Sequence, residues 1–248
     1  MRVAAIYDIH SNLPALEAVL EEIYQIGVDY IVVGGDVVPG PLPNETLAAL
    51  QSLQVPALFI HGNGERDTIA MLRGSDINAV PEQAREIVEW VGRVLSPAHM
   101  DVLTSWPQTV RLAIPGLGDV LFCHATPRSD REIFTVLTPE ERLLPIFAPA
   151  AAAVVVCGHT HMQFDRTVGG TRVVNAGSVG MPFGRAGAYW VLLGPNVELR
   201  RTAYDLAAAA ARISASDYPH AADFAVRSVE QPPSAAVMLE TLERAAVK

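Results

Sequence analysis

The sequence predicts one large α/β domain, because short buried strands alternate with amphipathic helices along it. Its 248 residues suffice for a single domain with a full core, and half of them are apolar. Continuous apolar runs with little polar alternation indicate strands that are covered on both faces. These runs are Val3–Ile6, Tyr30–Val33, Ala57–Ile60, Val120–Cys123 and Val154–Cys157.

The first helix is expected to begin near Pro14, with Asn12 or Leu13 at the cap position, because apolar residues then recur at helical spacing. Since this helix stands between two strands, it predicts a right-handed crossover unit. A second helix is expected around residues 44–53. A helical insertion is expected over about residues 64–106, within a single domain that spans residues 1–248.

The second half of the chain predicts more antiparallel pairing. A Gly-containing loop separates Thr109–Ile114 from Asp119–Cys123, which indicates a hairpin. Thr138 to Glu141 form a capping box that should open a helix ending before Pro149. Further antiparallel strands are expected at Arg172–Asn175, Ala188–Leu193 and Val197–Arg201, with tight turns at Gly169-Gly170 and Gly194-Pro195.

The remainder of the chain, from about residue 204 to 248, is expected to be a helical extension, because it is rich in alanine. It is broken at Pro219 and at Pro232-Pro233. Its apolar residues from Ala235 to Val247 could provide a surface for a homo-oligomer.

Charge and composition narrow the class of protein. The net charge of −9 disfavours a standing nucleic-acid partner, which normally needs a basic face. Cys123 and Cys157 each end a buried strand, so a disulfide framework is not expected. The apolar start of the chain is too short for a signal peptide, and the longest apolar run is shorter than a membrane span. We therefore expect a cytoplasmic protein without a membrane partner.

Polar residues that could bind a metal follow five of the predicted strands. The carboxyl ends of strands in an α/β sheet form the crevice where ligands bind, so these distant segments should converge there. Each residue alone could have a structural role, such as capping a turn, but the set together predicts a metal site. The residues are Asp8, His10, Asp36, Asn63, His124, His159 and His161.

In order and spacing, these residues resemble the metal-binding signature of the calcineurin-like metallophosphoesterases. The matching elements are Asp8-Ile9-His10, Gly35-Asp36, Gly62-Asn63, His124 and Gly158-His159-Thr160-His161, which span residues 1 to about 200. The segment Asn175-Ala176-Gly177-Ser178 is similar to the small bacterial and archaeal phosphodiesterase branch. The resemblance implies a two-sheet α/β sandwich with flanking helices.

The resemblance also implies how two divalent metal ions would be held. Asp8, His10, Asp36 and His161 would bind one ion, and Asp36, Asn63, His124 and His159 the other. A mixed set of carboxylate, imidazole and amide ligands suits Mn²⁺, Fe²⁺, Zn²⁺ or Ni²⁺ rather than Ca²⁺. A hydroxide that bridges the ions would then attack phosphorus in line. Asp36, Asn63, His124 and Arg128 would be the catalytic residues, with Arg128 either holding phosphoryl oxygens or lying exposed on the surface.

One position departs from the family pattern. Many members have a histidine after the Gly-Asn pair that is thought to protonate the leaving group, whereas this chain has Gly64. Since a poor leaving group gains most from a general acid, we expect a phosphodiesterase or nucleotide hydrolase acting on a small nucleotide-like substrate. The alternatives are a phosphomonoesterase and a non-catalytic binding scaffold. Phe134, Phe183 and Tyr218 could each stack on a base or simply pack.

Overall fold

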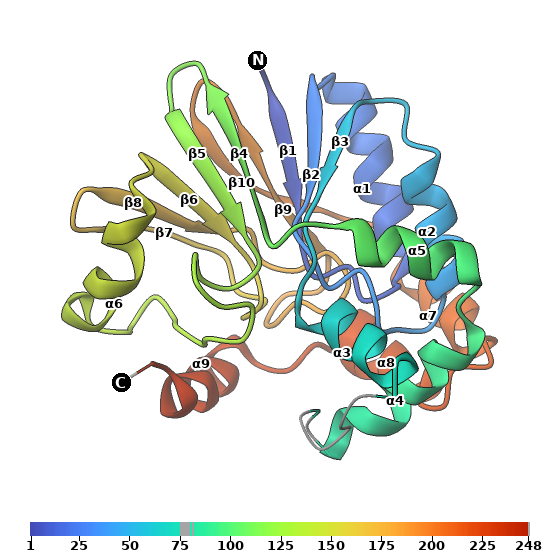
Figure 1. Ribbon diagram of the computed structural model, residues 1–248. Helices are drawn as coiled ribbons and strands as arrows, with labels where there is room; N and C mark the ends of the chain where they lie inside the picture. Colours follow the sequence, from blue (N-terminus) through green and yellow to red (C-terminus); the bar gives the residue numbers. More distant parts are fainter. Residues whose placement is uncertain (75–79, 81, 248) are drawn as a thin grey trace.

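In the computed structural model, which describes residues 1–74, 80 and 82–247, two five-stranded sheets lie face to face (Figure 1). The first has the order β10-β9-β1-β2-β3 and the second the order β4-β5-β6-β8-β7. The strands of the first sheet are β1 (Val3–Ile6), β2 (Tyr30–Val33), β3 (Ala57–Phe59), β9 (Ala188–Leu193) and β10 (Val197–Thr202). Those of the second are β4 (Thr109–Ile114), β5 (Gly118–Cys123), β6 (Val154–Cys157), β7 (Phe164–Val168) and β8 (Thr171–Asn175).

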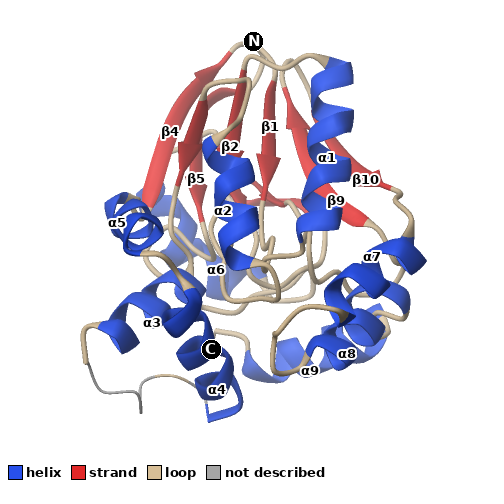
Figure 2. Ribbon diagram, turned by 90° about the vertical axis from the view of Figure 1, so that its right-hand side faces the viewer, coloured by secondary structure: helices blue, strands red, loops and turns tan. Residues whose placement is uncertain are grey.

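Helices cover the outer face of each sheet, so the domain has four layers (Figures 1 and 2). The helices over the first sheet are α1 (Leu13–Ile26), α2 (Pro43–Gln51) and α5 (Pro97–Ser105), and the second sheet carries α6 (Glu140–Phe147) with a 3-10 turn at Ala148–Ala150. Alternate residues of β1 serve two cores, because successive side chains of a strand point to opposite faces. Ala4 and Ile6 pack under the helices, while Val3 and Ala5 pack against the second sheet. This arrangement confirms the predicted two-sheet α/β sandwich.

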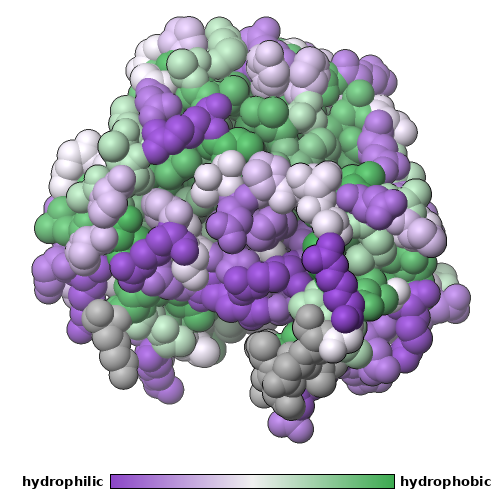
Figure 3. Space-filling model, viewed as in Figure 1, coloured by the Kyte–Doolittle hydropathy of each residue, from purple (hydrophilic) through white to green (hydrophobic). Residues whose placement is uncertain are grey.

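Parallel pairing in both sheets sends strand ends to a common edge. β1 pairs in parallel with β2, and β2 with β3. In the second sheet β5, β6 and β8 are parallel neighbours. The arrowheads of these strands point to the lower edge of the sandwich, where long loops gather (Figure 1). Hydrophilic residues form a band across this face below the strands (Figure 3).

One local prediction was wrong. Arg172–Asn175 lies in β8 and pairs antiparallel with β7 across the turn at Gly169-Gly170, as predicted, and it also pairs in parallel with β6 in the second sheet. The capping box at Thr138 does not form. Pro139 is the cap residue of α6, and the Thr138 hydroxyl instead accepts from the Thr135 amide and donates to Glu243.

The remaining helices lie below the sheets. Between β3 and β4, besides α5, these are α3 (Asn63–Leu72) and α4 (Glu82–Val94). Residues 75–79 and 81 of the expected helical insertion, and residue 248 of the expected extension, lie outside the described residues. The C-terminal part contains α7 (Leu206–Ser214), α8 (Ala221–Phe224), a π-helical turn at Ala225–Glu230 and α9 (Ala235–Ala245). Among the described residues, no helix has the length and apolar character needed to cross a membrane.

Candidate metal centre

All seven candidate metal ligands that the sequence singles out come together at the lower edge of the sandwich. They follow the ends of β1, β2, β3, β5 and β6, so each is placed by a different strand or loop. Their ligand atoms form two groups, within each of which the atoms lie within 4.8 Å of one another. Asp8, His10 and His161 form the first group, and Asp36, His124 and His159 form the second.

The backbone holds most of these residues in an unusual conformation. Asp8, His10, Asp36, His159 and His161 all have positive φ angles, between 45° and 67°. A left-handed conformation costs a residue with a Cβ about 1–2 kcal/mol, so the surrounding structure must stabilise it. Strain of this kind is typical of functional sites. Here Asp8 and His10 both reach the site, while Ile9 between them packs into the core.

Backbone carbonyls fix the orientation of three imidazole rings. The Nδ1 atoms of His10, His124 and His161 lie 3.2, 2.9 and 2.8 Å from the carbonyl oxygens of Pro39, Gly34 and Met181. Since a carbonyl can only accept, each Nδ1 must carry a proton, and Nε2 is the nitrogen that faces the site. Metal-binding histidines are commonly held by such a hydrogen bond from the other ring nitrogen.

The free nitrogens of the first group face each other. Nε2 of His10 lies 3.2 Å from Nε2 of His161, which in turn lies 3.4 Å from Oδ1 of Asp8. In neutral rings these three atoms are all acceptors, so they need a proton or a cation among them. Oδ1 of Asp8 is buried and has no hydrogen-bond partner among the described residues. The donor set therefore fits a bound cation.

Asp36 lies between the two groups. Its Oδ2 atom is 3.8 Å from Nε2 of His10 in the first group and 3.5 Å from Nε2 of His124 in the second. Its other oxygen accepts from the Gly64 amide at 2.7 Å, which fixes the carboxylate plane. Asn63 completes the second group, because its side-chain amide lies 3.0 Å from Nδ1 of His159 and 3.3 Å from Nε2 of His124.

The charges of the second group depend on one another. Despite its burial, the pKa of Asp36 is well below the usual range, because His124 and His10 stabilise its charged form. Burial opposes protonation of His124, but Asp36 raises its pKa to about 10. Burial and the neighbouring His124 lower the pKa of His159 to about 4. Without a cation the group thus holds an ion pair beside a neutral imidazole.

Glu65 is a residue of the site that the sequence did not single out. Its carboxylate accepts hydrogen bonds from four backbone amides, those of Asp36, Val37, Val38 and Gly62, at 2.7 to 3.0 Å. Burial and Asp36 raise its pKa to about 7, while the amides favour the charged form. This carboxylate ties the loop that carries Asp36 to the start of α3. The available signal was a glutamate in the first turn of a helix.

The segment Asn175-Ala176-Gly177-Ser178 supports the ligands without touching their free atoms. The side-chain amide of Asn175 donates to the Gly158 carbonyl at 2.7 Å and to the Thr160 hydroxyl at 3.0 Å. Ser178 donates to the carbonyl of Asp8 at 2.7 Å. Both side chains are buried, so they fix the loops on either side of the first group.

Arg128 lies at the rim of the site. It lines a small polar pocket of about 110 Å³ together with His124, Arg66 and Asp130. Its guanidinium is exposed and forms a forked ion pair with Glu132, at 2.6 and 2.9 Å. Arg66, which the sequence did not single out, pairs with Asp130 at 2.7 Å. The second carboxylate oxygen of Asp130 is buried without a partner among the described residues.

Comparison with known proteins gives the same class. A family described as the calcineurin-like phosphoesterase superfamily domain matches residues 1–194. The chain is 29% identical over 178 residues to the uncharacterized protein MJ0912 of Methanocaldococcus jannaschii. The aligned region covers 71% of this chain and 69% of that protein.

Two solved structures share the whole architecture. The hypothetical protein PH1004 from Pyrococcus horikoshii OT3 superposes with a TM-score of 0.79 at 19% identity, over 94% of this chain and 99% of that one. The metallophosphoesterase from Sphaerobacter thermophilus superposes with a TM-score of 0.70 at 26% identity, over 92% of this chain and 98% of that one.

The family match and the likeness to a metallophosphoesterase identify the chain as a hydrolase of phosphoric esters. The chain belongs to the calcineurin-like phosphoesterase superfamily.

Proposed function

We propose that the protein is a phosphodiesterase or nucleotide hydrolase that uses two divalent cations bridged by Asp36. The observation that carries this proposal is the position of Oδ2 of Asp36, 3.8 Å from one ligand group and 3.5 Å from the other. Two dications at about 3.5–4 Å need a shared anionic ligand to offset their repulsion. Oδ1 of Asp8 also lies within 3.9 Å of Nε2 of His124, so both carboxylates border the space between the groups, and we assign the shared position to Asp36.

The ligand chemistry supports ions of intermediate softness. Asp8, His10 and His161 would hold one ion with Asp36. Asn63, His124 and His159 would hold the other, with the Asn63 oxygen turned toward the ion. Imidazole and carboxylate together suit Mn²⁺, Fe²⁺, Zn²⁺ or Ni²⁺. When bound, such ions lower the pKa of water and stabilise charge on phosphoryl oxygens, so they supply the hydroxide that attacks phosphorus.

The chain itself would position the ester. His124 lines the small polar pocket, and the Asn63 amide lies 3.1 Å from the carbonyl oxygen of Asp130 in its wall, so the phosphoryl group would sit beside these two residues. Arg128 at the rim of this pocket can turn from Glu132 to a phosphoryl oxygen, because its side chain is exposed and flexible. Arg66 offers a second guanidinium at the same rim.

Gly64 favours diesters over simple alkyl monoesters. A Cβ at this position would collide with the carbonyl oxygen of Val38 and would crowd Pro39 and Asp36. A histidine therefore cannot be accommodated there without a backbone change, and the acid that protonates a poor leaving group in relatives has no equivalent at this position. We expect a substrate with a leaving group that departs without such help.

A small phosphorylated or nucleotide-like substrate fits the charge of the protein better than a nucleic acid does. The net charge is −9, so there is no general attraction for a polyanion. Bound cations would reverse the sign of the field at the site alone.

The test is reconstitution. The protein is stripped of metal, reloaded with Mn²⁺, Fe²⁺, Ni²⁺ or Zn²⁺, and assayed with the mono- and diester of p-nitrophenyl phosphate beside Asp36→Asn. We expect diester turnover that exceeds monoester turnover and is abolished by the substitution. Faster monoester turnover would favour the phosphomonoesterase. Tight metal binding without turnover of these esters or a nucleotide panel would favour a scaffold.

A further inference from the structure

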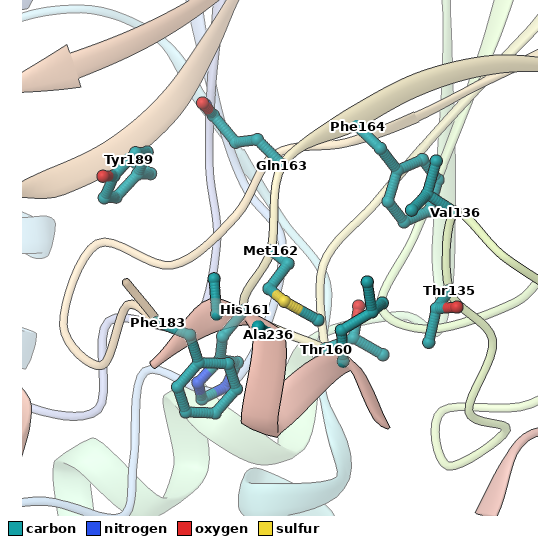
Figure 4. Close-up of a pocket in the computed structure, with 12 residues that line it drawn as sticks. Thr135, Val136, Thr160, His161, Met162, Gln163, Phe164, Phe183, Tyr189 and Ala236 are labelled. Atoms are coloured by element: carbon teal, nitrogen blue, oxygen red, sulfur yellow. The ribbon is translucent and has the colours of Figure 1, made fainter. Parts of the chain in front are cut away.

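A second, larger pocket lies next to the first ligand group. It has a volume of about 350 Å³ and shares His161 with the metal centre. Figure 4 shows its walls, which come from the segment before α6, the loop after β6, Phe183 and the start of α9. Such a volume lies in the usual range for small-molecule sites, which is about 300–1,000 Å³.

The lining is mainly apolar. Its apolar members are Val136, Met162, Phe164, Phe183, Ala235, Ala236 and Leu239.

The polar members of the lining are largely engaged by the protein itself. The Thr135 hydroxyl donates to Glu243 at 2.5 Å, and the Tyr189 hydroxyl donates to the carbonyl of Arg185 at 2.8 Å. The amide nitrogen of Gln163 donates to the carbonyl groups of three other residues, all within 3.1 Å. A ligand in this pocket would therefore find apolar surface and few groups ready to form hydrogen bonds.

The pocket contacts the candidate metal centre through the imidazole ring of His161. The Phe183 ring stacks on His161, with centroids 5.4 Å apart and planes inclined by 25°. Nε2 of His161 points at Asp8 and His10, so the same imidazole presents an edge to the metal centre and a face to the pocket wall. In Figure 4, Met162 and Phe183 flank this ring, with Ala236 of α9 close by.

We propose that this pocket binds an apolar alkyl or aryl substituent of the phosphoric ester, which makes esters with such a group the preferred substrates. The inference rests on the proposed function, since it places the phosphoryl group at the metal centre. It goes beyond that function because it assigns α9 and Phe183 to substrate selection. A nucleobase would gain less here, because its polar edge would meet few free partners.

The test uses n-alkyl phosphates from methyl to hexyl as ligands for the Mn²⁺-loaded protein, with dissociation constants measured by calorimetry. Every member presents the same phosphate, so only burial of the chain differs. Each buried methylene should tighten binding about fourfold, the equivalent of about 0.8 kcal/mol, until the pocket is filled. Equal dissociation constants along the series would overturn the proposal.

Matched variants on α9 locate the effect. Ala236→Phe fills the pocket and should remove the dependence of affinity on the length of the alkyl group while leaving the affinity for methyl phosphate unchanged. Val237→Phe adds the same bulk one residue further on, at a side chain that is 60% exposed and outside the pocket lining, and should preserve the dependence. A dependence that survives in Ala236→Phe would contradict the assignment.

A measurement on the unaltered chain avoids reliance on variants. With methionine labelled at the ¹³C-methyl group, hexyl phosphate should shift the Met162 resonance, and methyl phosphate should not. Met162→Leu assigns that resonance. An unshifted Met162 signal at saturating hexyl phosphate would refute the proposal.

Two further outcomes separate this inference from the proposed function. If diesters are not hydrolysed but alkyl phosphates still bind with increasing affinity, the proposed function fails and the pocket assignment stands. If adenosine monophosphate binds more tightly than hexyl phosphate and Ala236→Phe abolishes that binding, the pocket is a base site and the inference is wrong.

Discussion

Asn175→Ala tests whether the metal ligands depend on the loop support beneath them. The wild-type amide is fully buried and makes three hydrogen bonds: it donates to Gly158 and Thr160 and accepts from the Gly177 amide at 2.8 Å. Alanine removes all three. At about 1 kcal/mol for each net hydrogen bond, the free energy of unfolding should fall by about 3 kcal/mol.

The same substitution should weaken metal binding. Gly158 and Thr160 flank His159, and Thr160 also precedes His161. Both histidines have positive φ angles. Without Asn175 these residues can relax toward ordinary backbone conformations, so the two imidazoles no longer point at the carboxylates. We expect a lower affinity for Mn²⁺, measured by calorimetry, together with the loss of stability measured by urea unfolding of the metal-free protein.

Asn196→Ala is the matched control. Asn196 lies exposed in the turn between β9 and β10, so its replacement should change the free energy of unfolding by less than about 0.5 kcal/mol. If Asn175→Ala were as stable as this control, the hydrogen-bond count would be wrong. If it lost stability but bound Mn²⁺ as the wild type does, the support of the ligands would be refuted.

Three other predictions concern the second ligand group. Glu65→Ala leaves four buried amides without their acceptor and should lower the free energy of unfolding by at least about 4 kcal/mol in urea titrations. An unfolding midpoint equal to that of the wild type would contradict this role of Glu65. Gly64→Ala should lower the free energy of unfolding by about 1–3 kcal/mol through overpacking. Gly170→Ala should leave it unchanged, because a Cβ there meets nothing within 4 Å. Equal effects of the two substitutions in the same titration would contradict this prediction. Because Asp36 raises the pKa of His124 to about 10, the metal-free protein gains stability from this pair below pH 6.5 and loses it as the pH rises toward 10. Metal must displace that proton, so calorimetry at pH 8 in buffers of different ionisation enthalpy should detect proton release, and its absence would refute the assignment.

The sequence predicted the site better than its surroundings because the site follows a local rule. Each ligand lies within four residues of the end of a strand, and parallel strands end at one edge, so the order of strands and polar residues was enough to bring Asp8 and His159 together. The five apolar runs reappear as strands, and four of them are mainly buried as predicted, whereas β3 lies at the edge of its sheet with its residues half-buried.

The missed features depend on contacts between distant segments. Three of the four amides that Glu65 accepts from lie 27 to 29 residues earlier in the chain, and its position in the first turn of a helix marks only the bond to Gly62. The pairing of Arg172–Asn175 with β6 was missed because a tight turn shows a hairpin but not which sheet the hairpin joins. The local sequence predicts that the Thr138 hydroxyl caps α6, whereas it donates to Glu243 of α9, 105 residues later.

The most direct test of the central claim is anomalous diffraction from crystals of the protein loaded with Mn²⁺. We expect two peaks about 3.5–4 Å apart, one beside Asp8, His10 and His161 and the other beside His124 and His159, with the Asp36 carboxylate in contact with both. A single peak, or two peaks of which only one touches Asp36, would contradict a centre bridged by that residue.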